Sequence, residues 1–167
     1  MPSRFPSSGL PALEAELDIA APVDRVWSIL SDLRSMGERS PETVRMFIAK
    51  TPEVGSRGLN LNRRGAVVWP TTTRITRWKP PAHDGSAAVA FHVGPTGVEW
   101  SYELTPAALP DGREGTRVVE RRSSLPKAGL AVRLTSRWLL GGSENHDVEL
   151  LEGMQRTLAA IKADAER

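Results

Sequence analysis

Four polar side chains in this sequence have the chemistry of acid–base catalysis. Asp147 and Glu120 are carboxylates, Tyr102 is a phenol and Arg63 is a permanent cation. A carboxylate that is buried, or that lies beside another charge, titrates outside its usual range, and enzymes obtain general acids and bases near neutral pH in this way. We therefore treat these four residues as candidate catalytic groups.

Asp147 is the most unusual of the four because it lies on the apolar side of a predicted helix. It falls in line with Leu150, Met154 and Leu158. Since a buried carboxylate without a partner is unfavourable, the position fits a wet cavity mouth or an ion pair with an arginine such as Arg63. It equally fits the start of the helix, where the helix dipole favours a negative charge.

Whether the Glu120 side chain points inward or into solvent depends on the phase of its strand. It shares one face with Val118 and Arg122, because side chains two apart in a strand point the same way. If Val118 faces the interior, Glu120 enters the cavity, and if Val119 does, Glu120 is solvated. The sequence is compatible with both arrangements.

A second set of residues has the character of a pocket wall, with aromatic or aliphatic bodies and a few hydroxyl groups. Small-molecule pockets combine apolar walls with a few placed polar groups. Taken singly, each residue is explained as simply by core packing or by strand propensity. The candidate ligand-binding residues are Leu61, Trp69, Thr71, Thr73, Phe91, Trp100, Tyr102 and Met154.

Other chemistries lack the residues they need. The chain has no cysteine, and His83 and His92 have no ligand pattern around them. His146 lies three residues from Glu149, but no second cluster accompanies that pair. Because a nucleophile elbow and a phosphate-binding loop are also missing, we predict no metal site and no cofactor.

The composition also excludes several classes of partner. The 167 residues carry a net charge of +2 without a basic cluster, which argues against nucleic-acid binding. No segment approaches the roughly 20 apolar residues of a membrane span, and the first residues do not resemble a signal peptide. We expect a cytoplasmic protein whose partner is a hydrophobic small molecule.

The elements that must position these residues are mostly strands. Val67 to Trp78 alternates, with Trp69, Thr71 and Thr73 on one face. In the segment 57–64, Leu59, Leu61 and Arg63 share a face, and Leu61 is placed among the wall residues for this reason. The other predicted strands cover residues 14–20, 45–50, 87–93, 98–105 and 116–125.

Helices are predicted at both ends of this run of strands. Pro22 suits a first helical position, and the helix it opens ends near Asp32, before a turn or second small helix over 35–41. The apolar stripe that includes Met154 and Ile161 predicts a helix over about 144–165. Apolar residues four apart between 130 and 138 predict a further helical segment, which Gly141 and Gly142 interrupt or kink.

These elements indicate an α+β fold in which a seven-stranded curved antiparallel sheet carries a long C-terminal helix over its concave face. Residues 1–12 are predicted to be a flexible tail, and residues 13–167 a single domain. We expect an enclosed pocket between helix and sheet of at least roughly 300 Å³, touched by Trp69, Trp100 and Met154.

Several short motifs resemble the START-like superfamily, and within it the bacterial polyketide cyclase/dehydrase and lipid-transfer-like branch. The resemblance covers residues 14–165 and implies the helix-grip fold. One departure is Gly58, where the family often has a bulky aromatic, and the missing bulk would enlarge a cavity. The motifs are Pro22 to Asp32, Asn62-Arg63 before Gly65, Trp69-Pro-Thr71, Trp100-Ser-Tyr102-Glu-Leu104, Gly115-Thr-Arg-Val118 with Glu120, and Glu152-Gly-Met154 before Thr157-Leu158.

The resemblance implies three functions, because this fold hosts carriers, enzymes and interaction modules. The first is binding of a hydrophobic or polycyclic small molecule. The second is a polyketide cyclase, aromatase or dehydratase, in which the cavity folds a reactive chain and one acid or base assists. The third is a co-chaperone-like or antitoxin-like interaction module. A dry cavity favours the first, an inward acid–base pair the second, and a filled core with an exposed apolar patch the third.

Overall fold

The computed structural model describes residues 12–124 and 144–167. In chain order, the elements are β1 (Leu13–Ile19), α1 (Val23–Leu30), the 3-10 helix η1 (Leu33–Glu38), β2 (Thr43–Phe47), β3 (Arg57–Arg64), β4 (Val67–Lys79), β5 (Ala87–Gly94), β6 (Val98–Ala108), β7 (Glu114–Ser124) and α3 (Glu144–Ala165). The predicted tail falls almost wholly outside the described residues, and the predicted helical segment around 130–142 falls entirely outside them.

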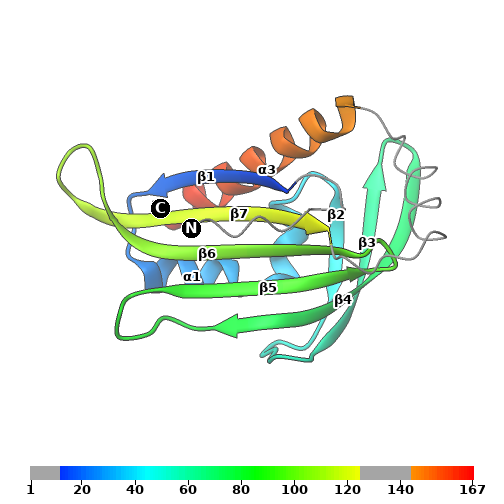
Figure 1. The fold of residues 1–167 in the computed structure, drawn as a ribbon, viewed down its shortest axis with the longest axis horizontal. Helices are drawn as coiled ribbons and strands as arrows, with labels where there is room; N and C mark the ends of the chain where they lie inside the picture. Colours follow the sequence, from blue (N-terminus) through cyan, green and yellow to red (C-terminus); the bar gives the residue numbers. More distant parts are fainter. Residues whose placement is uncertain (1–11, 125–143) are drawn as a thin grey trace, which may run out of the picture.

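The seven strands form one antiparallel sheet in the order β1-β7-β6-β5-β4-β3-β2. Figure 1 shows how the sheet curves, so that β2, β3 and one end of β4 turn away from the plane of β5, β6 and β7. Helices α1 and η1 lie behind the sheet in this view, and α3 runs along the side of β1. The predicted curved sheet with its C-terminal helix is confirmed.

The core lies between the concave face of the sheet and the helices. From α3, the side chains of Met154, Leu158 and Ile161 are at most 1% exposed, which confirms the predicted apolar stripe. Helix α1 has little length of its own to stabilise it, and it is held by the burial of residues such as Val26 and Leu30. Its amphipathic spacing therefore decides its place in the fold.

Strand β4 changes its phase within its length. The odd positions Thr71, Thr73 and Ile75 are buried, as the alternation predicts. A bulge between Ile75 and Arg77 then inserts one residue. The side chain of Trp78 consequently turns inward and meets Trp27 of α1, with ring centroids 5.2 Å apart in an edge-to-face arrangement.

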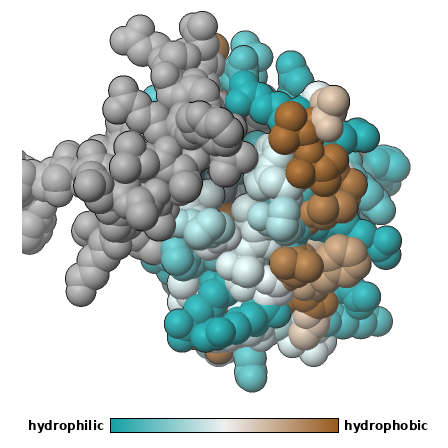
Figure 2. All heavy atoms as spheres, turned by 90° about the vertical axis from the view of Figure 1, so that its right-hand side faces the viewer, coloured by the Kyte–Doolittle hydropathy of each residue, from teal (hydrophilic) through white to brown (hydrophobic). Residues whose placement is uncertain are grey.

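Strand β3 has the opposite phase to the one predicted. Asn60 and Asn62 are buried, whereas Leu59 is 49% exposed on the outer face. Figure 2 shows a band of apolar side chains on this side of the molecule. The exposed large apolar residues of β2, β3 and β4 are Val44, Phe47, Leu59, Val67 and Val68.

Candidate functional site

A pocket of about 610 Å³ lies between the concave face of the sheet and α3. Trp69, Trp100 and Met154 all line it. The volume is well above the lower limit of roughly 300 Å³ for small-molecule sites. The predicted size and the three predicted wall residues agree with this pocket, but the pocket is partly open rather than enclosed.

Apolar side chains from several elements supply much of the wall. Met36 comes from η1 and Met46 from β2, and they face Phe91 of β5 and Trp100 of β6 across the curved sheet. These side chains are buried except for Trp100, which is half-buried. The curvature matters here, because a flat sheet would not bring β2 opposite β6.

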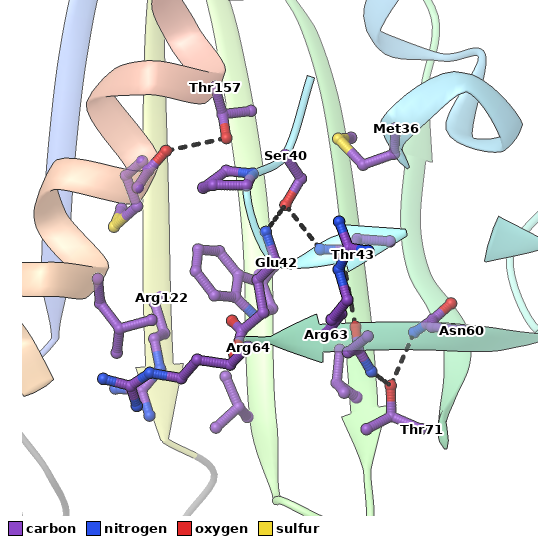
Figure 3. Close-up of a pocket in the computed structure, with 18 of the residues that line it drawn as sticks. Met36, Ser40, Glu42, Thr43, Asn60, Arg63, Arg64, Thr71, Arg122 and Thr157 are labelled. Atoms are coloured by element: carbon purple, nitrogen blue, oxygen red, sulfur yellow. Dashed lines mark hydrogen bonds between the residues drawn. The ribbon is translucent and has the colours of Figure 1, made fainter. Parts of the chain in front are cut away.

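A polar network occupies the wall formed by β3 and β4. Asn60 donates from Nδ2 to the hydroxyl of Thr73 at 2.7 Å and to that of Thr71 at 3.1 Å. The hydroxyl of Thr73 donates back to Asn60 Oδ1 at 3.0 Å, and Asn62 donates to Thr71 at 3.0 Å (Figure 3). Because each buried amide and hydroxyl finds a partner, the inward asparagines are stable in a buried strand.

The phase of β7 places Glu120 inside the molecule. Val118 is fully buried and Glu120 is 2% exposed, so the inward alternative is the one that forms. The Tyr102 hydroxyl donates to Glu120 Oε1 at 2.7 Å, while Glu120 Oε2 is buried without a hydrogen-bond partner. Burial raises the pKa of Glu120 to about 8, against a smaller lowering by the Tyr102 hydrogen bond.

Tyr102 and Glu120 form the inner end of the pocket. They lie opposite each other in the β6–β7 ladder. One step further along each strand, Leu104 and Val118 are fully buried and lie outside the lining. Burial also raises the pKa of Tyr102, with Glu120 adding to the effect. Both groups therefore keep their protons at neutral pH, and Glu120 can donate one to a bound molecule.

The other end of the pocket is charged. Arg64 of β3 pairs with Glu149 of α3, and both side chains are exposed. Arg122 of β7 is buried, and Figure 3 shows Arg64 and Arg122 reaching toward the same end of the pocket, close to Glu42. Burial raises the pKa of Glu42, and the attraction of Arg64 and Arg122 acts in the opposite direction.

Burial and neighbouring charges also act in opposite directions on the pKa of Arg122. Burial lowers the pKa of its guanidinium, and the negative charges of Asp147 and Glu42 raise it. The charge of Asp147 therefore acts on Arg122. Arg63 is exposed on the rim, on the opposite face of β3 from Arg64.

Two other expectations for β3 are wrong. Leu61 lies on the outer face, outside the lining of the pocket, because Asn60 and Asn62 take the inner positions. Gly58 does not enlarge the cavity, since a Cβ atom there would lie 2.7 Å from the carbonyl oxygen of Phe47. Its missing side chain instead allows β2 to approach β3.

The remaining predicted residues divide between the pocket and its support. Trp69, Thr71, Phe91, Trp100, Tyr102, Glu120 and Met154 line the pocket. Thr73 lies behind Asn60 as a hydrogen-bond partner, and Asp147 is half-buried near Arg122. Glu42, Asn60, Asn62, Arg64 and Arg122 also line the pocket and were not predicted from the sequence. The asparagines carried a signal, because asparagine is depleted in strand interiors and two at alternate positions need partners.

Within residues 12–124 and 144–167, no three His, Cys, Asp or Glu side chains come together as a metal site requires. Over the same ranges, no helix has the length and apolar character needed to cross a bilayer.

Solved structures share this architecture at low sequence identity. A STAR-related lipid transfer protein from Xanthomonas axonopodis is 15% identical with a TM-score of 0.63, covering 98% of this chain and 91% of its own. The Zhui aromatase/cyclase from Streptomyces sp. R1128 is 17% identical with a TM-score of 0.53, covering 94% of both chains. The di-domain aromatase/cyclase StfQ of the steffimycin biosynthetic pathway is 17% identical with a TM-score of 0.58, covering 93% of this chain and 50% of its own. At these identities the likeness establishes the fold alone.

Sequence comparison places the chain more specifically. No curated protein sequence is similar enough to count as a match. A family model, however, matches residues 11–166, nearly the whole chain. Its description names cyclase, dehydrase and lipid-transport functions on one scaffold. The chain therefore belongs to the polyketide cyclase/dehydrase and lipid transport family.

Proposed function

We propose that this protein binds a hydrophobic or polycyclic small molecule in the pocket between the sheet and α3. The observation that carries the proposal is the pocket itself, whose volume of about 610 Å³ is held open under a helix whose own apolar stripe is buried. Trp69, Phe91 and Trp100 give it aromatic walls. Pockets of this size and lining are typical of small-molecule sites.

Trp100 provides the sharpest test because it lies on the pocket wall. Large aromatic side chains dominate apolar contacts, so Trp100→Ala should weaken the binding of a fluorescent polycyclic or fatty-acid probe about tenfold or more. Arg74→Ala is the matched control, since Arg74 is exposed on the outer face of β4. Circular dichroism must show that both variants are folded, because truncating a core tryptophan costs about 3–5 kcal/mol.

Equal probe affinity in the two variants would place the binding site elsewhere. Native mass spectrometry of freshly purified protein complements this test, since a molecule that co-purifies would identify the ligand directly.

A cyclase, aromatase or dehydratase activity is the second candidate, and the Tyr102–Glu120 pair favours it. A carboxyl group with a pKa of about 8 is suited to acid–base work at neutral pH. Turnover of a poly-β-ketone substrate that is lost in Glu120→Gln would establish the enzyme. An interaction role has less support, because the space between sheet and helix is hollow, although apolar side chains are exposed near β2 and β3.

A further inference from the structure

Arg122 is a buried cation that lacks a partner of its own. It is 5% exposed and lines the pocket from the inner face of β7. Among the described residues, none forms a hydrogen bond or an ion pair with its guanidinium, and Asp147 and Glu42 act on it only through their charge. Removing a charge from water without pairing it is costly, and a guanidinium keeps its proton in proteins. The guanidinium nitrogens are not among the fully buried polar atoms that lack a partner, so they reach the space of the pocket. The pocket therefore presents a positive charge that no described carboxylate pairs with directly.

The neighbouring carboxyl group does not neutralise this charge. Glu120 lies two residues from Arg122 on the same face of β7, a separation of roughly 6.5 Å along a strand. Its Oε1 accepts a hydrogen bond from Tyr102 and its Oε2 makes none. With a pKa of about 8, the group is uncharged at neutral pH.

The charges around Arg122 also indicate how much negative charge a ligand should bring. Arg64 is engaged by Glu149 at the rim. Asp147 and Glu42 partly offset Arg122 from a distance. Arg63, Arg64 and Arg156 also line the pocket but are exposed, so Arg122 is the one buried arginine among the described lining residues. The buried positive charge is therefore that of one guanidinium, which suits a monoanion better than a dianion. A planar guanidinium matches a planar carboxylate through two parallel hydrogen bonds.

We infer that the ligand is a carboxylate-bearing amphiphile, whose single negative charge pairs with Arg122 while its apolar body lies against the aromatic wall. This inference rests on the proposed binding function and adds the chemical class of the head group. The fold also orients the ligand. Arg122 lies opposite the half-buried Trp100 in the β6–β7 ladder, and the buried Tyr102 lies further in along β6. The carboxylate therefore lies at the level of Trp100, and Tyr102 lies at the inner end of the pocket.

The test uses two ligands with the same hydrocarbon chain, dodecanoate and dodecan-1-ol, and the full-length protein at pH 7. Binding is followed by calorimetry or by tryptophan fluorescence, since Trp69 and Trp100 line the pocket. Charge-assisted hydrogen bonds contribute enough that the wild type should bind the acid at least about tenfold more tightly than the alcohol. Arg122→Met should abolish this preference and leave the alcohol affinity unchanged or improved.

Two further variants make the result specific. Arg122→Lys keeps the charge without the bidentate geometry, and it should retain only part of the preference. Arg74→Met removes an exposed arginine from the outer face and should behave as the wild type does. If the wild type binds both ligands equally, the head-group inference fails while the binding function stands. If neither ligand nor the polycyclic probe binds, the binding function itself fails. The wild-type comparison decides the question even if Arg122→Met does not fold.

Discussion

At the scale of single residues, two opposing effects act on the pKa of the Glu120 carboxyl group. Burial in the protein raises its pKa, the hydrogen bond from Tyr102 lowers it, and the value of about 8 shows that burial is the larger effect. Arg122 on the same strand lines the same cavity. The other charged groups in its lining are Glu42, Arg63 and Arg64 on the side of the sheet and Glu149, Glu152 and Arg156 on α3. Neutral Glu120 and charged Arg122 therefore belong to one electrostatic arrangement.

We predict that Glu120 makes the protein less stable as the pH rises from about 5 to about 8. The unfolded carboxyl loses its proton near its ordinary pKa of 4.5, whereas the folded one keeps it up to about 8. Between these values the folded state binds more protons, so the free energy of unfolding falls with rising pH, by an amount on the order of 4 kcal/mol. Thermal or urea unfolding across this pH range measures the effect.

Glu120→Gln should remove most of this pH dependence, because the amide has the same shape and does not titrate. Glu16→Gln, at an exposed position of β1, is the matched control and should keep the wild-type dependence. A wild-type profile that stays flat between pH 5 and 8, or one that Glu120→Gln leaves unchanged, would mean that Glu120 is ionised in the folded protein.

At the scale of elements, the strands could be predicted from the sequence more readily than the faces they bury. Alternation placed Thr71 and Thr73 correctly, because a strand with one apolar and one polar face has a clear phase. The same reasoning failed for β3, where Leu59 and Leu61 look like the buried face. Asn60 takes that place because Thr71 and Thr73 of the next strand satisfy its amide, and a hydrogen bond between strands is not visible in either strand alone.

The residues of the site were also predictable only in part. Trp100 and Met154 were predicted because large apolar side chains on a strand and a helix mark the interior. The charged end was not predicted, since Glu42 precedes β2 and meets Arg122 only through the curvature of the sheet. The bulge in β4 was also hidden, because its inserted residue cannot be recognised from the alternation of Ile75 to Trp78.

The approach of β2 to β3 gives a prediction about Gly58. A Cβ atom there would lie 2.7 Å from the Phe47 carbonyl oxygen, which belongs to the backbone and cannot move aside independently. Gly58→Ala should therefore destabilise the protein by about 1–3 kcal/mol, as overpacking does. Gly153→Ala is the matched control, because its Cβ would meet only Pro41 at 3.4 Å, and alanine favours a helix by about 1 kcal/mol.

Urea unfolding of both variants checks this prediction. Gly153→Ala should be neutral or stabilising and Gly58→Ala clearly destabilising. Equal effects of the two substitutions would show that β2 does not depend on a close approach at Gly58.

At the scale of the whole molecule, the pocket lies between the curved sheet and the helices, and the helices contact the sheet near both of its edges. Helix α3 contacts β1, β7 and α1, and η1 packs on β2 at the opposite edge. A ligand in the pocket would touch the sheet, η1 and α3 together, since all three contribute to its lining. Its binding energy would therefore stabilise the complete fold rather than one element.

This arrangement predicts that a bound ligand raises the melting temperature only while the pocket is open. At a ligand concentration of 100 times Kd, binding stabilises the folded state by about 2.7 kcal/mol, which corresponds to a rise of roughly 5–10 °C for a domain of this size. Val93→Trp, a substitution in the half-buried wall of β5, should fill part of the cavity and abolish the rise while leaving Arg122 and Glu120 in place. Differential scanning calorimetry with dodecanoate or the polycyclic probe measures both proteins. A rise of equal size in the wild type and in Val93→Trp would place the ligand outside this pocket, since the indole would occupy the space that the ligand needs.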